Sequence, residues 1–189
     1  MKLVIASNNQ HKIEEIKAVL NGKFEEITTL DDERIVCDPE ENGKTFLENA
    51  LIKARATAEH TNKVVLADDT GLCVNALNGR PGVHSARYAS AHDSVANRRK
   101  LLAELEGVTY RSAYFTTVVV LLYPDGKVLT GEGRVHGKII EEENGSNGFG
   151  YDCIFYSDEL GKTFGQASTE EKLTVSHRSR ALKDLLNKL

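Results

Sequence analysis

Several features that would point to common classes of protein are missing from this chain of 189 residues. Its three cysteines, Cys37, Cys73 and Cys153, lie far apart and form no CxxC pair, so we expect free thiols in a reducing compartment. No run of basic residues suggests a groove for nucleic acid, and the formal net charge is −4. No apolar stretch approaches the ~20 residues of a membrane span. We therefore expect a cytoplasmic protein that binds neither nucleic acid nor membranes.

Two common nucleotide-binding sequences are also missing. The chain contains no GxxxxGK followed by Ser or Thr, and no GxGxxG that opens a helix. If this protein binds a nucleotide, it does so without a Walker loop and without a dinucleotide-binding fingerprint.

Apolar periodicity and turn residues predict a mixed α/β sheet. The predicted strands are 2–6, 64–67, 113–123 and 127–140, with weaker signals at 24–28 and 34–36. The predicted helices follow the turn at 7–9, span 45–60 and 93–105, and run from 175 to the end. Because we see no repeat, low-complexity tract or linker, we expect residues 1–189 to form a single domain with two lobes.

Two predicted helices begin with cations. Ser7-Asn8-Asn9 precedes His11 and Lys12, and Ser176 precedes His177 and Arg178. A helix N-terminus carries partial positive charge, so cations there are mildly unfavourable, by ~0.3–1 kcal/mol each. One interpretation is a pair of solvated surface ends, and another is an anion such as phosphate bound at both.

Two adjacent acids, Asp68 and Asp69, follow the predicted strand 64–67. Asp-Asp-Thr-Gly is also good turn chemistry, so an ordinary turn is an even alternative. Glu40, Glu41 and Glu48 lie within plausible reach, and several carboxylates facing phosphate-binding cations suggest Mg²⁺, which needs few protein ligands and shares phosphate oxygens. A carboxylate can also orient or deprotonate a water. Asn49 and Lys53 lie four residues apart on one helix face, which would be polar. An ordinary solvated stripe is the alternative for that face.

A glycine-rich loop at 144–150 leads into a segment with two aromatic residues. Glycines let a backbone approach a ligand closely. Phe149 or Tyr151 could stack on a flat base, and Asp152 could accept hydrogen bonds from its edge. The alternative is a tight turn whose aromatic side chains belong to the core.

Five motifs in order resemble one known family, the inosine triphosphate pyrophosphatases. They are SNNQHKIEEI, ENGKTFLENALIKA, LADDTGLCVNALNGRPGVHSARYA, GFGYDCIF, and EEK followed by SHRSRAL. They run from residue 7 to residue 182, and each is weak alone while the ordered set is specific. Asn8, His84, Cys153 and Leu173 depart from the usual residues of the family.

The resemblance implies an elongated mixed β-sheet flanked by helices, with two lobes, a central nucleotide cleft and a homodimer. It implies Mg²⁺ held by Glu41 and Asp69, with Asp69 as the catalytic proton acceptor. The residues that it assigns to the substrate are Ser7, Asn8, Asn9, Gln10, His11, Lys12, Lys53, Thr70, Phe149, Gly150, Tyr151, Asp152, Lys172, His177 and Arg178.

The activity that the resemblance implies is hydrolysis of non-standard purine triphosphates (ITP, dITP and XTP) to the monophosphate and pyrophosphate. Selectivity is expected from the His177-Arg178 pair, whose donors suit the 6-oxo group of hypoxanthine or xanthine. Two alternatives stay open: a pyrophosphatase of modified pyrimidine triphosphates, and a nucleotide sensor that binds without turnover.

Overall fold

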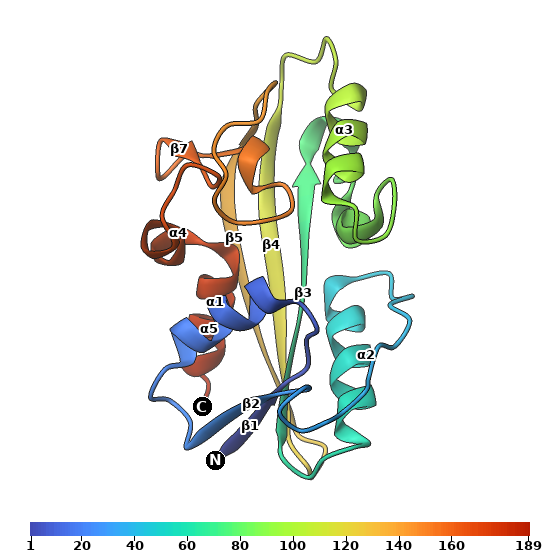
Figure 1. The fold of residues 1–189 in the computed structure, drawn as a ribbon, viewed down its shortest axis with the longest axis vertical. Helices are drawn as coiled ribbons and strands as arrows, with labels where there is room; N and C mark the ends of the chain where they lie inside the picture. Colours follow the sequence, from blue (N-terminus) through green and yellow to red (C-terminus); the bar gives the residue numbers. More distant parts are fainter. The chain divides into compact units, whose positions relative to one another are not determined.

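Seven strands form one mixed sheet in the computed structural model, which describes residues 1–189 (Figure 1). The strand order is β2-β1-β3-β4-β5-β6-β7. β1 pairs in parallel with β2 and β3, whereas β6 pairs antiparallel with β5 and β7. The strands are β1 (Lys2–Ile5), β2 (Glu26–Thr29), β3 (Val64–Val74), β4 (Ser112–Leu122), β5 (Val128–Ile139), β6 (Phe155–Ser157) and β7 (Lys162–Thr163).

Helices flank this sheet, which confirms the expected fold class. The α-helices are α1 (Gln10–Leu20), α2 (Phe46–Ala58), α3 (Ser94–Glu104), α4 (Thr169–Val175) and α5 (His177–Leu186). Three short 3₁₀ turns are η1 (Asn75–Leu77), η2 (Gly82–Arg87) and η3 (Asp152–Ile154). No helix is both long enough and apolar enough to cross a membrane.

The chain divides into two compact units, and the three long strands β3, β4 and β5 each contribute to both. Unit 1 comprises Met1–Asp69, Thr117–Gly133 and Arg178–Leu189. Unit 2 comprises Thr70–Thr116 and Arg134–His177. The nucleotide cleft expected between two lobes stays a prediction.

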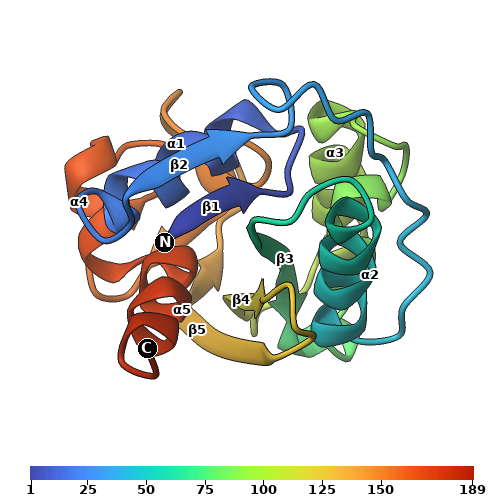
Figure 2. The same cartoon turned by 90° about the horizontal axis from the view of Figure 1, so that it is seen from below.

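Unit 1 has two apolar layers because successive strand residues face opposite sides of the sheet. Leu66 and Leu121 pack with α1 and α5, whereas Ala67 and Val120 pack with α2. Figure 2 accordingly shows α5 and α2 on opposite sides of β3 and β4. Neighbouring residues of one strand can therefore serve two different helices.

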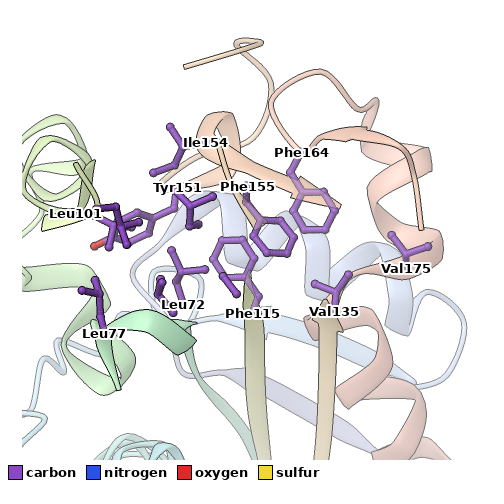
Figure 3. Packing of buried hydrophobic residues seen from close by; sticks show 14 residues of the cluster. Leu72, Leu77, Leu101, Phe115, Val135, Tyr151, Ile154, Phe155, Phe164 and Val175 are labelled. Atoms are coloured by element: carbon purple, nitrogen blue, oxygen red, sulfur yellow. The ribbon is translucent and has the colours of Figure 1, made fainter. Parts of the chain in front are cut away.

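Unit 2 is built around a cluster of aromatic side chains (Figure 3). Phe115 on β4 lies 4.7 Å from Phe155 and 6.1 Å from Phe164 between ring centroids. Leu72 of β3 and Leu101 of α3 belong to the same cluster and are fully buried. This core supports the glycine-rich segment near residue 150.

Most predicted elements are confirmed, including the helix that Thr45 caps by accepting a hydrogen bond from the Glu48 N–H. The strand predicted at 34–36 is wrong, because these residues form no strand and Val36 is 95% exposed. The apolar side chain of Val95, in the first turn of α3, is also exposed. The last helix, predicted to start at residue 175, starts at His177 instead. Val175 is the last residue of a separate helix, α4.

The strand predicted to stop at residue 67 continues to Val74. Asp68 and Asp69 therefore lie inside β3 rather than after it, and neither belongs to a turn. Acids are depleted in strands, which is why the strand was predicted to end before Asp68.

A glycine on β5 gives a test of the packing of α5 on the sheet. A Cβ at Gly131 would lie 2.2 Å from the carbonyl oxygen of Ala181 and 2.8 Å from the amide nitrogen of Leu185. Gly→Ala at a compatible position stabilises a protein by ~0.4–1 kcal/mol. Here we expect Gly131→Ala to destabilise by about 1–3 kcal/mol, because backbone atoms must move.

Urea denaturation measures this change in the free energy of unfolding. Val128→Ala on the same strand is the control, because Val128 is exposed and its truncation should cost less than about 0.5 kcal/mol. A Gly131→Ala protein as stable as wild type would show that α5 is not held against β5 as described.

Candidate active site

Two adjacent carboxylates on β3 face different helices. Strand alternation turns Asp68 toward the side of α1 and α5 and Asp69 toward the side of α2. Both are almost fully buried, at 2% and 5% exposure. A buried carboxylate needs partners, so each acid defines its own polar centre.

Asp68 is the centre of a buried ion network. The Lys12 ammonium on α1 lies 3.2 Å from its Oδ2, and the Nε of Arg178 on α5 also lies 3.2 Å from that oxygen. The other end of the Arg178 guanidinium pairs with Glu15, which is 9% exposed. The cations that begin α1 and α5 are thus matched by acids of the protein itself.

Neighbouring charges outweigh burial in setting the ionisation of Asp68, the centre of this network. Burial alone would raise the pKa of Asp68, but Lys12 and Arg178 outweigh it and hold the pKa well below its ordinary value. Burial lowers the pKa of Lys12, with the charge of Asp68 opposing that effect. The Asp68 side chain is therefore committed as an anion in a structural role.

Asp69 has a more divided environment. Its Oδ2 accepts a hydrogen bond from the Asn49 amide at 3.1 Å, and its Oδ1 lies 3.7 Å from the Lys53 ammonium. Lys53 also lies 3.3 Å from Glu41, on the loop before α2. Asn49 is fully buried and Lys53 largely so, which excludes the solvated stripe.

The basicity of Asp69 differs sharply from that of its neighbour. Burial raises the pKa of Asp69 to about 6, with Lys53 opposing the rise and Glu41 adding to it. Burial lowers the pKa of Lys53, but the nearby acids, Asp68 first, outweigh it and raise the pKa. A carboxylate with a pKa near neutrality is suited to taking a proton from water.

Glu41 and Asp69 are the carboxylates that could hold a metal. No group of three or more His, Cys, Asp or Glu side chains is arranged as a metal site. Both acids already pair with one cation, the Lys53 ammonium, so the space between the two carboxylates attracts positive charge. Two carboxylates fit Mg²⁺, which binds through one or two of them plus phosphate oxygens.

The first loop lies at the start of α1 and is mostly exposed. Asn9 caps the helix by accepting from the Lys12 N–H at 3.2 Å, and its own N–H donates to Ser7 Oγ. Asn8 donates to the Cys37 carbonyl at 3.1 Å. Gln10 and His11 are exposed in the first turn of the helix.

The second group of predicted residues lies in unit 2 around a buried ion pair. Lys172 on α4 donates to Asp152 at 2.8 Å, and Asp152 also accepts from the Phe149 N–H at 3.0 Å. The Lys172 ammonium lies 4.9 Å from the centroid of the half-buried Phe149 ring. Gly148 has φ +71° and a Cβ there would lie 2.1 Å from Asp152, so the loop tolerates only glycine.

The other aromatic and cationic candidates of this region are buried. Tyr151 is 6% exposed and its hydroxyl donates to the Ser85 carbonyl at 2.7 Å, which supports a core role. Burial raises the pKa of that hydroxyl. His177 is 3% exposed and stacks on Phe115 with 4.7 Å between centroids. Half-buried Thr70 and Gly150 complete the set in unit 2.

Two residues that support these groups were not predicted. Glu15 pairs with Arg178, and its only signal was its position beside the buried Ile13 and Ile16 of α1. Arg98 of α3 donates to the Gly150 carbonyl at 2.8 Å and so holds the glycine-rich segment. Nothing in the local sequence distinguishes Arg98 from other helix cations.

Comparisons with known proteins show the family to which this chain belongs. The model of the Ham1 family matches residues 3–188. The chain belongs to the Ham1 family. It is 48% identical over 190 residues to a dITP/XTP pyrophosphatase of Thermoanaerobacter sp. (strain X514), covering 99% of this chain and 96% of that one.

Two solved structures of Ham1 proteins share the fold of this Ham1 chain. The Staphylococcus aureus protein is 43% identical, with a TM-score of 0.88, covering 100% of this chain and 97% of that chain. The Coxiella burnetii protein is 38% identical, with a TM-score of 0.89, covering 100% and 98%. The resemblance inferred from the motifs is therefore confirmed across the Ham1 chain.

The buried network of this Ham1 protein gives a stability prediction. Arg178→Met should destabilise by about 3–5 kcal/mol, because it leaves the buried Asp68 and Glu15 carboxylates without their shared guanidinium. The matched control is Lys188→Met, which removes a pair with Asp184 whose side chains are 46% and 42% exposed. That loss should stay below about 1 kcal/mol.

Both variants are compared with wild type by thermal and urea denaturation. Equal, small losses in the two variants would contradict the assignment of Asp68 as the centre of a buried network.

Proposed function

We propose that this chain is a pyrophosphatase of dITP, ITP and XTP that releases the nucleoside monophosphate and pyrophosphate. The observation that carries the proposal is the buried Asp69 carboxylate beside Lys53 and Glu41. Hydrolysis of a phosphoanhydride needs an acid that can take a proton from water and a nearby cation that stabilises the developing negative charge. Asp69 and Lys53 can fill these two roles. Curated relatives named dITP/XTP pyrophosphatase support the substrate class.

We propose Mg²⁺ as the cofactor, held by Glu41 and Asp69. Bound there, the ion would neutralise phosphate charge and act as a Lewis acid on the triphosphate. The pairing of both acids with Lys53 supports this site, because the two carboxylates already hold one cation, and a substrate phosphate would give the Lys53 ammonium another anionic partner.

The catalytic step begins with water at Asp69. Asp69 accepts a proton from the water, and the water oxygen bonds to the α-phosphorus. The bond from the α-phosphorus to the bridging oxygen breaks, and that oxygen leaves with pyrophosphate. Lys53 and Lys12 supply positive charge as the leaving group gains negative charge. The start of α1, at Ser7–Lys12, is the place proposed for the terminal phosphates, because a helix N-terminus favours anions.

The base is assigned to residues of unit 2. Phe149 is the strongest candidate for stacking, because its ring is half-buried while Tyr151 is in the core. Lys172 and Asp152 hold the segment that carries Phe149. His177 stays the candidate donor to the 6-oxo group, whereas the burial of Arg178 in its ion network favours a positioning role.

We further propose that residues 1–189 act as a single functional domain, in a homodimer located in the cytoplasm. The family model covers residues 3–188, which supports one domain. The homodimer and the location rest on the resemblance to the inosine triphosphate pyrophosphatases and on the free cysteines.

A substrate panel with separate assays of pyrophosphate and orthophosphate tests the proposal. We expect pyrophosphate from dITP, ITP and XTP at least tenfold above ATP, GTP and dTTP, and no turnover after chelation of divalent ions. Release of orthophosphate would indicate a phosphatase. A preference for pyrimidines would favour the pyrimidine alternative, and binding without release would indicate a sensor.

A further inference from the structure

Asn49 connects the two acids of the candidate metal centre. It lies on the inward face of α2 with no exposed surface, four residues before Lys53. Its side-chain nitrogen donates to Asp69 Oδ2 at 3.1 Å. Its side-chain oxygen accepts from the Gly43 N–H at 2.8 Å. Gly43 lies two residues after Glu41 on the same loop.

The first of these bonds distinguishes the two oxygens of Asp69. Oδ2 is occupied by the Asn49 amide, whereas Oδ1 is the oxygen that faces the Lys53 ammonium at 3.7 Å. The carboxylate cannot rotate about its Cβ–Cγ bond without breaking the bond to a buried donor, which is costly. Oδ1 is therefore the oxygen left to meet a cation or a water.

The second bond fixes the loop that carries Glu41. That loop is irregular, and two of its backbone N–H groups anchor it to α2. Gly43 donates to Asn49 Oδ1 at 2.8 Å, and Lys44 donates to Glu48 Oε2 at 2.6 Å. The fit is close, because a Cβ at Gly43 would lie 2.6 Å from Asn49 Oδ1 and 2.7 Å from Glu48 Cβ. Only glycine lets the loop come this near to the helix.

We propose that Asn49 is a positioning residue that sets the placement of Asp69 and Glu41 relative to each other through its two ends. An amide side chain is suited to this task because it offers a donor and an acceptor at once. The two hydrogen bonds, together with the contacts of Lys53 to both acids, close a ring through Asp69, Asn49, Gly43, Glu41 and Lys53. The kcat measurement in the test below depends on the proposed function, whereas the metal titration does not.

A purely structural role is the competing interpretation, since any buried amide with two bonds contributes to stability. A structural role predicts a lower melting temperature with unchanged metal affinity and unchanged kcat for the folded protein. A positioning role predicts that both of these parameters change while KM changes little.

The test compares wild type with Asn49→Ala, Gly43→Ala and the control Ala54→Gly. Ala54 is buried on the same helix among apolar side chains, so its replacement destabilises α2 without touching the acids. Mn²⁺ alone is titrated by calorimetry, and dITP hydrolysis is measured with saturating Mg²⁺.

We expect Asn49→Ala to weaken Mn²⁺ binding at least tenfold and to lower kcat at least fiftyfold, with KM within about threefold of wild type. Gly43→Ala should weaken Mn²⁺ binding at least fivefold, because its new methyl group displaces the Glu41 loop. Ala54→Gly should lower the melting temperature and leave both parameters unchanged.

Wild-type Mn²⁺ affinity and kcat in Asn49→Ala would overturn the proposal, as would equal losses in Ala54→Gly. If Asn49→Ala does not fold, Gly43→Ala decides, and wild-type Mn²⁺ affinity in that variant overturns the proposal. A wild-type protein that hydrolyses dITP but binds no Mn²⁺ would also overturn it, since Asn49 would have no metal centre to position.

Failure of the proposed function would look different. A wild-type protein that releases no pyrophosphate from dITP contradicts the assigned activity, yet the Mn²⁺ titrations still test the role of Asn49.

Discussion

The rest of the candidate site depends on one interaction, the buried ion pairs of Asp68 with Lys12 and Arg178. It ties β3 to the starts of α1 and α5, three segments that are far apart in the sequence. Removing an ion from water is expensive, so this arrangement is stable only when each charge keeps its partner. Glu15 pairs with the same guanidinium, and all four of these side chains belong to unit 1.

Strand alternation places the second carboxylate, Asp69, in a different environment from Asp68. Because Asp68 must face α1 and α5, the next residue faces α2, where Asn49 and Lys53 lie. The first acid is surrounded by cations and held ionised, whereas burial raises the pKa of the second to about 6. One dipeptide thus supplies a structural anion and a candidate base, and the difference comes from the helices on each face.

Much of the fold could be predicted from the sequence, and the reasons for the misses are physical. The Thr45 cap and the Val118–Leu122 run gave α2 and β4, because both signals are local. The extension of β3 through Asp68 and Asp69 was missed, because the ion pairs that stabilise acids in a strand are formed by residues far away in the sequence. The short α4, β6 and β7 carry too few residues for a periodic signal.

The same limit applies to the candidate site. The motifs named the acids and cations as one group, but they could not show that Arg178 and Lys172 are buried in ion pairs. Burial depends on what packs over a side chain, so it follows from the tertiary structure. Asn49 could be placed on the face of Lys53 from spacing alone, while its two hydrogen bonds could not.

Asp68→Asn and Asp69→Asn, measured side by side for stability and dITP turnover, test the division of roles most directly. Asp68→Asn should lose about 2–4 kcal/mol of stability, because two buried cations lose their anion. Asp69→Asn should stay within about 1 kcal/mol of wild type and lose turnover by about 10²–10⁴-fold, the usual contribution of a general base. Near wild-type turnover in Asp69→Asn, or wild-type stability in Asp68→Asn, would contradict the assignment of these two acids.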